Sequence, residues 1–253
     1  MAHFYDCSDM DSLELKEEIT TPTQAKKYGA KIYPSVTTVI SSTIRDPFLD
    51  VIHKPRSLVK FARMEEHADK DWRALEKLCY GERECPETGD MIPSSEFGTR
   101  VHKCAEKLLD AYRYNDEYEE DEHYDPYAMP FLDWVKERGH KVIATEYMVA
   151  DKLIKLCGSV DVILKGGSSG KMMICDYKCR KSKQFYDKDL WQLAIESEML
   201  RRKGLDYRPS CVSVCIDVTT KKHHHKLWSD EEVEDAIQIM KWISKLYWKI
   251  RMS

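Results

Sequence analysis

Two aspartates and a lysine in the middle of the chain, Asp161, Asp176 and Lys178, are residue types that bind metal ions and act on phosphate. Side chains alternate between the faces of a strand, so Asp176 and Lys178 share one face. Two carboxylates close together repel each other unless a positive charge lies between them. A hard cation such as Mg²⁺ takes oxygen ligands and keeps several waters, which leaves room for a phosphate. The residue types therefore predict a divalent-metal site in which Lys178 orients water or stabilises negative charge.

A predicted hairpin brings the two aspartates together. The β-prone segments 153–164 and 171–179 flank a flexible Gly-rich turn at 166–170, and so short a turn joins antiparallel strands. With the turn centred near residue 168, the numbers of opposing residues sum to about 336, and those of Asp161 and Asp176 sum to 337. Opposed Cβ atoms lie roughly 4.5–5.5 Å apart. The alternative is a salt bridge between Lys178 and the aspartates on a solvated sheet face.

Glu146 and His102 are candidates for the same site. Glu146 lies among apolar neighbours on the predicted strand 141–150, where a metal-bound water or Lys178 would be its partner. An exposed edge-strand charge is the alternative. His102 follows Gly98 by four residues on a predicted helix, and the small side chains on that face allow another element to approach closely. A purely structural histidine is the alternative there.

Other polar and aromatic residues are candidates for contacts with a nucleic acid. Gln192 and Glu196 lie four residues apart on a predicted helix beside Trp191, where they either contact phosphate and water or lie on solvated helix surface. Arg180 and Lys181 follow the strand that carries Asp176 and could form a local basic groove. Trp191 could stack on a base, although aromatic residues at helical spacing more often pack in a core.

Hydrophobic periodicity predicts the elements that position these residues. The predicted order is helix, three strands, helix and strand, at 94–112, 141–150, 153–164, 171–179, 187–202 and 211–218. A helix between the third and fourth strands favours a parallel, right-handed crossover, so the sheet is mixed. A further helix is predicted at 130–139, and a last one follows the capping box at Ser229 with Val233, Ile237, Met240 and Tyr247 buried. The fold class is therefore α/β.

The chain divides into two parts on this pattern. Residues 1–30 form a polar segment that we expect to be only partly ordered. Residues 31–253 form one domain, with a helical N-terminal elaboration at 31–93, a core at 94–218 and a C-terminal helix at 229–251. At 253 residues the chain is long enough to bury a sizeable core.

Composition restricts the functional classes. A net charge of −4 and a pI near 6.2 argue against a passive DNA coat, but are compatible with an enzyme that carries acidic metal ligands beside a local basic groove. With 42% hydrophobic and 33% charged residues, the chain is typical of a soluble globular protein. Its acidic N-terminus lacks the plan of a secretory signal, and no apolar run approaches the roughly 18 residues of a membrane span. We therefore expect an intracellular protein.

Cysteine and histidine usage offers two further metal hypotheses. The nine cysteines include no CxxC pair, and several lie in apolar runs, which favours buried reduced thiols over a metal cluster. His223, His224 and His225 could bind a metal or a phosphate, with a solvated basic turn between a strand and a helix as the alternative.

Taken in chain order, these segments resemble the PD-(D/E)XK nuclease superfamily. The matching motifs are Gly98-Thr99-Arg100-Val101-His102, Glu146, Gly158-Ser159-Val160-Asp161, Asp176-Tyr177-Lys178 and Gln192-Leu193. The resemblance is greatest to the RecB-like exonuclease branch, which includes CRISPR-associated exonucleases and the mitochondrial genome maintenance exonuclease. Tyr33-Pro34-Ser35-Val36-Thr37-Thr38 also resembles a segment near the start of phage and mitochondrial members. If the protein is phage-encoded, we expect it in the cytoplasm of the host cell.

The resemblance implies a restriction-endonuclease-like αβββαβ core and a set of site residues. It implies that His102, Asp161, Asp176 and the backbone carbonyl of Tyr177 bind Mg²⁺ or Mn²⁺. It also implies a catalytic Lys178, a supporting Gln192 and an acidic Glu146 whose role varies among members. Members with an iron–sulfur cluster use one early cysteine and a tight late trio, and this chain has only Cys211 and Cys215 late, so no cluster is expected.

The function expected on this basis is that of a metal-dependent DNA exonuclease acting on linear or single-stranded ends. Ser35, Thr37 and Thr38 would grip the phosphates of a threaded strand through short hydroxyl donors, or would merely fill a β-prone turn. Three rivals stay open: an endonuclease of the same fold, a catalytically idle nucleic-acid-binding protein, and a metalloprotein built on structural cysteines.

Overall fold

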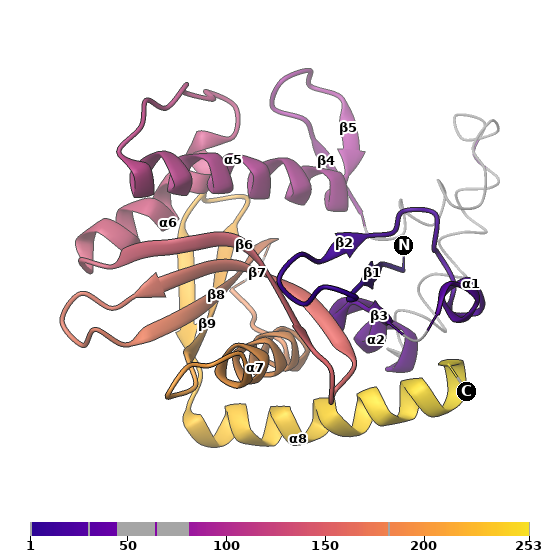
Figure 1. Ribbon diagram of the computed structural model, residues 1–253. Helices are drawn as coiled ribbons and strands as arrows, with labels where there is room; N and C mark the ends of the chain where they lie inside the picture. Colours follow the sequence, from indigo (N-terminus) through magenta and orange to yellow (C-terminus); the bar gives the residue numbers. More distant parts are fainter. Residues whose placement is uncertain (1, 30, 45–63, 65–80, 182, 253) are drawn as a thin grey trace.

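A five-stranded mixed sheet is the centre of the molecule (Figure 1). The computed structural model describes residues 2–29, 31–44, 64, 81–181 and 183–252. The sheet order is β10-β9-β8-β7-β6. The strands are β6 (Lys141–Asp151), β7 (Leu156–Lys165), β8 (Met172–Arg180), β9 (Ser210–Asp217) and β10 (His223–Leu227). The α/β class with a mixed sheet is confirmed.

Strand directions agree with the sequence pattern. β7 and β8 pair antiparallel across the Gly-rich turn, and β8 and β9 pair parallel through an intervening helix. Val162 lies opposite Cys175, so opposing residues in this hairpin have numbers that sum to 337. The predicted register was thus within one residue. The regular pairing ends at Val162, one position before Asp161 would meet Asp176.

Helices cover both faces of the sheet (Figure 1). The predicted helices at 94–112, 187–202 and 229–251 are all confirmed, with small differences at their ends. The helix predicted at 130–139 begins five residues earlier, because Pro126 supplies the preset backbone of a first turn. The four are α5 (Ser94–Tyr114), α6 (Asp125–Glu137), α7 (Asp187–Arg202) and α8 (Asp230–Tyr247), which a π-helical turn at Trp248–Met252 continues.

Alternation along the strands separates two apolar cores. Val162, Cys175 and Tyr177 pack on the side of α5 and α6. Ile163 and Ile174 pack with α7 and α8, and the four residues predicted to be buried on α8 are buried. Because Asp176 lies between Cys175 and Tyr177 in the strand, its side chain belongs to the face toward α7. The alternation therefore positions a charged residue at the margin of a core.

The polar N-terminal segment, expected to be only partly ordered, contains three short regular elements within its described residues. It contributes β1 (Phe4–Asp6) and β2 (Glu14–Leu15) to a three-stranded sheet with β3 (Ile32–Pro34), and it contains α1 (Pro22–Tyr28). The side chains of Phe4, Ile19 and Ala25 are buried. Pairing of β1 with β3 is long-range, so local polarity gave no sign of it.

The N-terminal elaboration continues with α2 (Val36–Thr43) and a short hairpin of β4 (Glu82–Glu84) and β5 (Met91–Pro93). Most of the predicted helical part, at 45–63 and 65–80, lies outside the described residues.

Two further results concern the C-terminal third and the membrane question. The His223–His225 segment was predicted to lie in a loop, and this was wrong, because it forms edge strand β10 against β9. Its histidines alternate across the strand, with no turn residue among them to interrupt the pairing. No helix in the described part of the chain is long and apolar enough to cross a membrane.

Candidate metal centre

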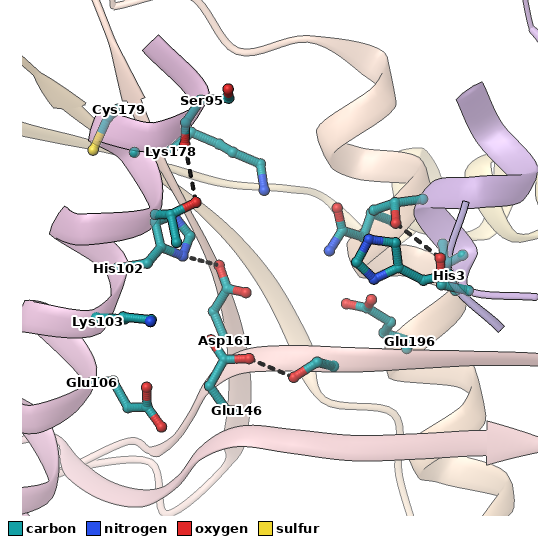
Figure 2. A pocket seen from close by; sticks show the side chains of 18 of the residues that line it. His3, Ser95, His102, Lys103, Glu106, Glu146, Asp161, Lys178, Cys179 and Glu196 are labelled. Carbon is teal, nitrogen blue, oxygen red and sulfur yellow. Dashed lines mark hydrogen bonds and ion pairs between the residues drawn. The ribbon is translucent and has the colours of Figure 1, made fainter. Parts of the chain in front are cut away.

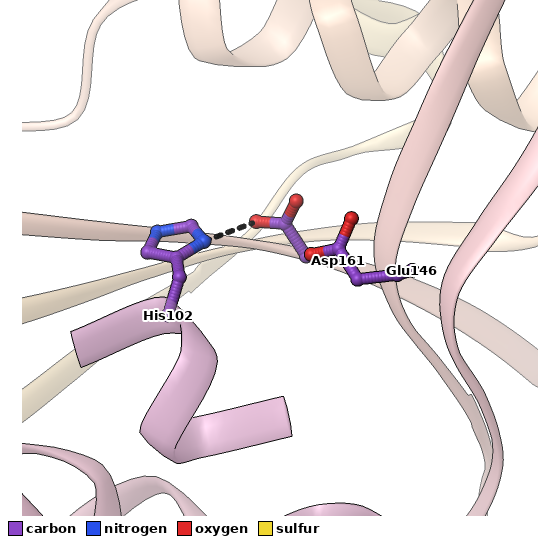
Figure 3. Close-up of side chains that lie close together, drawn as sticks. All are labelled: His102, Glu146 and Asp161. Carbon is purple, nitrogen blue, oxygen red and sulfur yellow. Dashed lines mark ion pairs between the residues drawn. The ribbon is translucent and has the colours of Figure 1, made fainter. Parts of the chain in front are cut away.

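His102, Glu146 and Asp161 converge from three different elements (Figure 3). One potential ligand atom from each lies within 4.8 Å of the other two. His102 projects from α5, and its Nδ1 lies 3.8 Å from Oδ2 of Asp161 on β7. Glu146 approaches from the neighbouring edge strand β6, where its Oε2 accepts a hydrogen bond of 2.7 Å from Ser159 Oγ. A helix and two strands thus bring together one imidazole and two carboxylates.

Asp176 and Lys178 form the second part of the site. Lys178 Nζ donates to Asp176 Oδ1 at 2.5 Å. The carboxylate of Asp176 is buried, and its other oxygen, Oδ2, has no hydrogen-bond partner. Asp176 was predicted to join Asp161 as a metal ligand, whereas Glu146 is the second carboxylate beside Asp161 and His102. The orphaned Oδ2 leaves Asp176 able to accept a further cation or donor.

Tyr177 lies between the two aspartates in a supporting position. Its backbone N–H donates to Asp161 Oδ2 at 2.8 Å, and its ring centroid lies 5.0 Å from that of His102. The phenol donates to the backbone oxygen of Tyr127 at 3.1 Å. These contacts fix the orientation of both Asp161 and His102. The family resemblance implied that the backbone carbonyl of Tyr177 is a metal ligand, and this role stays a prediction.

The backbone at Glu146 has an unusual conformation. Its φ is +43°, in the left-handed region that non-glycine residues seldom occupy. A residue held there costs of order 1–3 kcal/mol and persists only where its surroundings enforce it. The positive φ occurs at the position on edge strand β6 that brings the carboxylate to Asp161 and His102. Such strain at a gathered set of ligands is typical of a functional site.

Gln192 and Glu196 approach from α7. Both are almost fully buried and line the same cavity. A Cβ atom added to Gly158 would lie 2.8 Å from Glu196 Oε1, so a larger residue here would push the Glu196 side chain out of its present position. The Gly158 of the sequence motif thus leaves room for an acidic side chain.

These groups face one cavity of about 750 Å³ (Figure 2). Residues of the N-terminal segment, α2, α5, β6, β7, β8 and α7 line it: His3, Tyr5, Ser35, Val36, Thr37, Ser95, Gly98, Thr99, His102, Lys103, Glu106, Glu146, Gly158, Ser159, Asp161, Lys178, Cys179, Gln192 and Glu196. Its volume lies in the range of small-molecule and cofactor sites. His102 and Asp161 lie toward α5, and His3 and Glu196 lie toward α2 and α7 (Figure 2).

The Ser-Val-Thr-Thr segment divides into structural and accessible residues. Ser35 is the N-cap of α2 and accepts from Thr38 N at 3.1 Å. Thr38 is buried, and its Oγ1 accepts from Ser35 Oγ and from His3 N, each at 2.8 Å. Thr37 is exposed and lines the cavity. The side chains of Ser35 and Thr38 are used mainly to hold α2 in place against the N-terminal strand. Of the three predicted phosphate contacts, Thr37 is therefore the accessible one.

The predicted basic groove is only partly available. Arg180 is held by Asp189 through two bonds of 2.6 and 2.7 Å, and it also donates to the backbone oxygen of Gln184. Lys181 is exposed beside it. Trp191 is partly buried against the core on the α7 side of the sheet. This agrees with the alternative of core packing rather than base stacking. The bidentate pair of Arg180 with Asp189 fixes the first turn of α7 relative to the end of β8.

Electrostatics inside the cavity favour a cation. Burial raises the pKa of Asp176 to about 6, with Lys178 opposing the shift and Asp161 adding to it. Burial, followed by the charges of Asp176 and Asp161, raises the pKa of Glu196 well above its usual value. Burial lowers the pKa of Lys178, but the charges of Asp176 and Asp161 outweigh it and raise the pKa overall, so this lysine stays charged. Asp161, Asp176 and Glu196 therefore all interact with the positive charge of Lys178.

The donor set fits a hard divalent cation. Carboxylate oxygens suit Mg²⁺ and Mn²⁺, and an imidazole is compatible with Mn²⁺. The unpartnered Oδ2 of Asp176 and the mutual repulsion of the acidic groups are both relieved by a positive ion. Eight cysteines in the described part of the chain are free thiols, and none belongs to the gathered ligand set.

Sequence reasoning missed several residues of the cavity. His3 and Tyr5 come from a segment predicted to be only partly ordered. Lys103 and Glu106 lie on α5, and Glu106 follows His102 by four residues, so helical periodicity could have placed it on the same face. Glu196 was considered only as a partner of Gln192, although a glutamate on an otherwise buried helix was a usable signal.

Comparisons with known proteins add little to this geometry. No family model matches the sequence, and no curated protein matches it. Among solved structures, the chain is similar to one described as the "Crystal structure of SSO0001", with 14% sequence identity and a TM-score of 0.34. The likeness covers 83% of this chain and 82% of that one. At this level of similarity it carries no argument, so function has to be inferred from the site itself.

Proposed function

We propose that this protein is a divalent-metal-dependent nuclease that hydrolyses the phosphodiester bonds of DNA. The observation that carries the proposal is the convergence of His102, Glu146, Asp161 and Lys178 on one cavity, with the buried carboxylate of Asp176 paired to Lys178. In this proposal His102, Asp161 and Glu146 hold Mg²⁺ or Mn²⁺, and the free oxygen of Asp176 adds a further donor. The core of α5, β6, β7, β8, α7 and β9 would then be restriction-endonuclease-like, as the sequence resemblance implies.

The reaction requires water to form a P–O bond as the P–O ester bond breaks. The bound cation would polarise the phosphoryl oxygen and make water more acidic. Lys178 stays protonated because its pKa is raised, so it acts as a fixed positive charge beside the phosphate and the attacking water. The proton of the water passes to solvent, and the leaving oxygen receives one in exchange. Gln192 and Ser159 are positioned to orient the phosphate and Glu146.

We further propose that the enzyme acts from DNA ends. His3 and Tyr5 on the N-terminal segment and Thr37 at the start of α2 line the cavity. His3 lies on the side of the cavity away from α5 (Figure 2). In this proposal a DNA strand enters between these walls by its end. Lys103 is exposed and lines the cavity, where it would supply positive charge for the phosphates of the strand.

The decisive experiment compares DNA topologies. The protein is incubated with Mn²⁺ and with matched linear and closed-circular DNA, each in single-stranded and duplex form, and the products are resolved over time. Linear DNA is expected to shorten progressively while closed circles stay intact. Asp176→Asn serves as the matched inactive variant, since it removes charge without changing shape.

Two of the rival functions, the endonuclease and the idle binding protein, give different results in this experiment. Rapid cutting of closed single-stranded circles would replace the exonuclease with an endonuclease. DNA binding without cleavage of any substrate, under Mg²⁺ and Mn²⁺ alike, would favour the idle binding protein. Cleavage by Asp176→Asn at the wild-type rate would end the active-site assignment.

A further inference from the structure

A second cavity of about 430 Å³ lies between the β6–β7 turn and α8. Figure 1 shows this turn lying beside α8, on the other side of the molecule from α5. The lining residues are Leu153, Ile154, Lys155, Arg202, Lys241, Ser244, Lys245 and Trp248. None of them lines the cavity of the metal centre. The two cavities are therefore separate sites.

Hydrogen bonds between the turn and the helix hold the walls of this second cavity. Ser244 Oγ donates to the backbone oxygen of Ile154 at 2.8 Å, and Trp248 Nε1 donates to that of Lys155 at 3.1 Å. Asp151 Oδ1 accepts from the backbone N–H groups of Leu153 and Ile154, at 2.7 and 2.8 Å. A cavity fixed in this way needs little reorganisation to receive a ligand.

The inner surface of the cavity is apolar. Ile154 and Trp248 pack partly against the core, and Leu153 is 84% exposed. The hydrogen bonds to Asp151 keep Leu153 on the outside of a rigid turn, so it cannot relax into the core. Covering this apolar surface with a ligand would remove it from water, which is favourable.

The rim of the cavity carries the positive charge of three lysines. Lys155, Lys241 and Lys245 have no carboxylate within salt-bridge distance among the described residues, and no aspartate or glutamate lines the cavity. Lys155 Nζ lies 5.1 Å from the centroid of the Trp248 ring. Arg202 differs from the lysines, because Glu198 at 2.9 Å and Asp151 at 3.5 Å already neutralise it. Lys245 Nζ lies 5.3 Å from the centroid of the Trp242 ring, and Lys241 contributes to lowering the pKa of Glu234. The three ammonium groups thus offer positive charge that no salt bridge among the described residues neutralises.

From this combination we infer that the cavity binds a small amphiphilic anion, with an apolar aromatic or aliphatic body and one carboxylate, sulfonate or phosphate group. The apolar body would lie on Leu153, Ile154 and Trp248, and the anionic group would meet Lys241 and Lys245. The volume suits one small molecule, since ligand sites commonly measure roughly 300–1,000 Å³. The inference does not depend on the proposed nuclease activity.

Three probes with one ring system and different charges test the ligand class. Naphthalenesulfonate, naphthalenemethanol and naphthylmethylammonium are titrated into the full-length protein by calorimetry. The sulfonate is expected to bind at least about 10-fold more tightly than the ammonium compound, with the alcohol between them. Equal binding of all three, or preference for the cation, would overturn the inference. So would binding of thymidine 5′-monophosphate without binding of naphthalenesulfonate, because the cavity would then belong to a nucleic-acid path.

Charge variants test the location of the site. The double variant Lys241→Glu with Lys245→Glu is expected to weaken sulfonate binding at least about 10-fold, and the corresponding glutamine pair by less. Lys171→Glu with Lys222→Glu is the matched control, since both lysines are exposed and far from the cavity in sequence. Wild-type binding by the Lys241/Lys245 pair, or equal loss in the control, would refute the assignment. DNA cleavage is expected to be unchanged in all of these variants, which separates this test from that of the nuclease.

Discussion

Histidines occur in two very different surroundings in this protein. His102 lies alone on α5, and its Nδ1 is 3.8 Å from a carboxylate oxygen of Asp161. His223 and His225 lie on edge strand β10 with their rings stacked at 5.5 Å, and both rings contact Trp134. Buried nitrogens of His223 and His224 have no hydrogen-bond partner. One region pairs imidazole with acid, and the other surrounds it with aromatic rings and further imidazoles.

The difference teaches what makes a histidine a candidate ligand. The triple histidine is the more conspicuous sequence signal, yet its ligand atoms do not gather with those of other His, Cys, Asp or Glu side chains in the described residues. Burial lowers the pKa of His223 to about 4, with the charges of His225 and His224 adding to the shift. Carboxylate neighbours, which come from distant strands, decide the role of His102.

The largest expected effect separates the two regions by metal affinity. Asp161→Asn is expected to weaken Mn²⁺ binding at least about 100-fold, because even partners outside the ligand set contribute 10–100-fold. His225→Ala is expected to leave Mn²⁺ affinity unchanged. Calorimetric titration of both variants measures the contrast. A comparable loss in His225→Ala would move the metal site to β10 and reverse the comparison.

Next in size is the effect of removing the lysine charge. Lys178→Gln is expected to lower the cleavage rate about 10²–10³-fold, as loss of a group that stabilises developing charge does. Glutamine retains a donor for the buried oxygen of Asp176, so the fold is preserved. Mn²⁺ affinity should stay within a few-fold of wild type. If affinity falls as far as in Asp161→Asn, the separation of ligand and catalytic roles is wrong.

Substitution of Glu146 is expected to change stability and metal affinity in opposite directions. Glu146→Gly is expected to raise the free energy of unfolding by up to about 1 kcal/mol, because glycine adopts the left-handed backbone without strain. The same change should weaken Mn²⁺ binding about 10-fold or more, through loss of a carboxylate. Glu146→Gln is the control, with weaker binding and no gain in stability. Urea unfolding and calorimetry report the two quantities, and a parallel loss of both would contradict the assignment.

The histidine strand should respond to acid independently of metal. The pKa of His223 is about 4 in the folded protein, against an ordinary value of 6.5, so the unfolded chain binds the proton more readily. The resulting loss of stability is absent above pH 6.5 and grows as the pH falls toward about 4. His223→Phe should reduce this dependence in urea unfolding curves, with or without Mn²⁺. An unchanged pH profile in this variant would show that other groups control acid unfolding.

The smallest effects concern the adjacent threonines of α2. Thr38→Val is expected to lower the free energy of unfolding by about 1–2 kcal/mol, since it leaves the backbone N–H of His3 without its acceptor. Thr37→Val should change stability by less than about 0.5 kcal/mol and weaken DNA binding a few-fold. Unfolding curves and DNA titrations of the two single variants provide the test. Equal stability losses would contradict the division into a buried and an accessible threonine.

Local patterns in the sequence determined most of the elements and part of the site. The periodicity of 94–112 and the alternation of 141–150 correspond to α5 and β6, and the Gly-rich turn predicted the β7–β8 register to within one residue. Asp161 and Lys178 were placed near each other on that basis alone. These signals were reliable because helix periodicity, strand alternation and turn chemistry act over only a few residues.

Only the tertiary structure decided which groups meet. Three features of the site each depend on segments that are separated in the sequence. The left-handed backbone at Glu146 brings its carboxylate to His102 and Asp161, Glu196 packs against Gly158, and His3 forms part of the cavity wall. The sequence pattern predicted a solvated loop at His223–His225, which instead pairs as a strand, and it did not reveal the pairing of β1 with β3. Pairing between distant segments depends on packing of the whole chain, and no window of neighbouring residues contains that information.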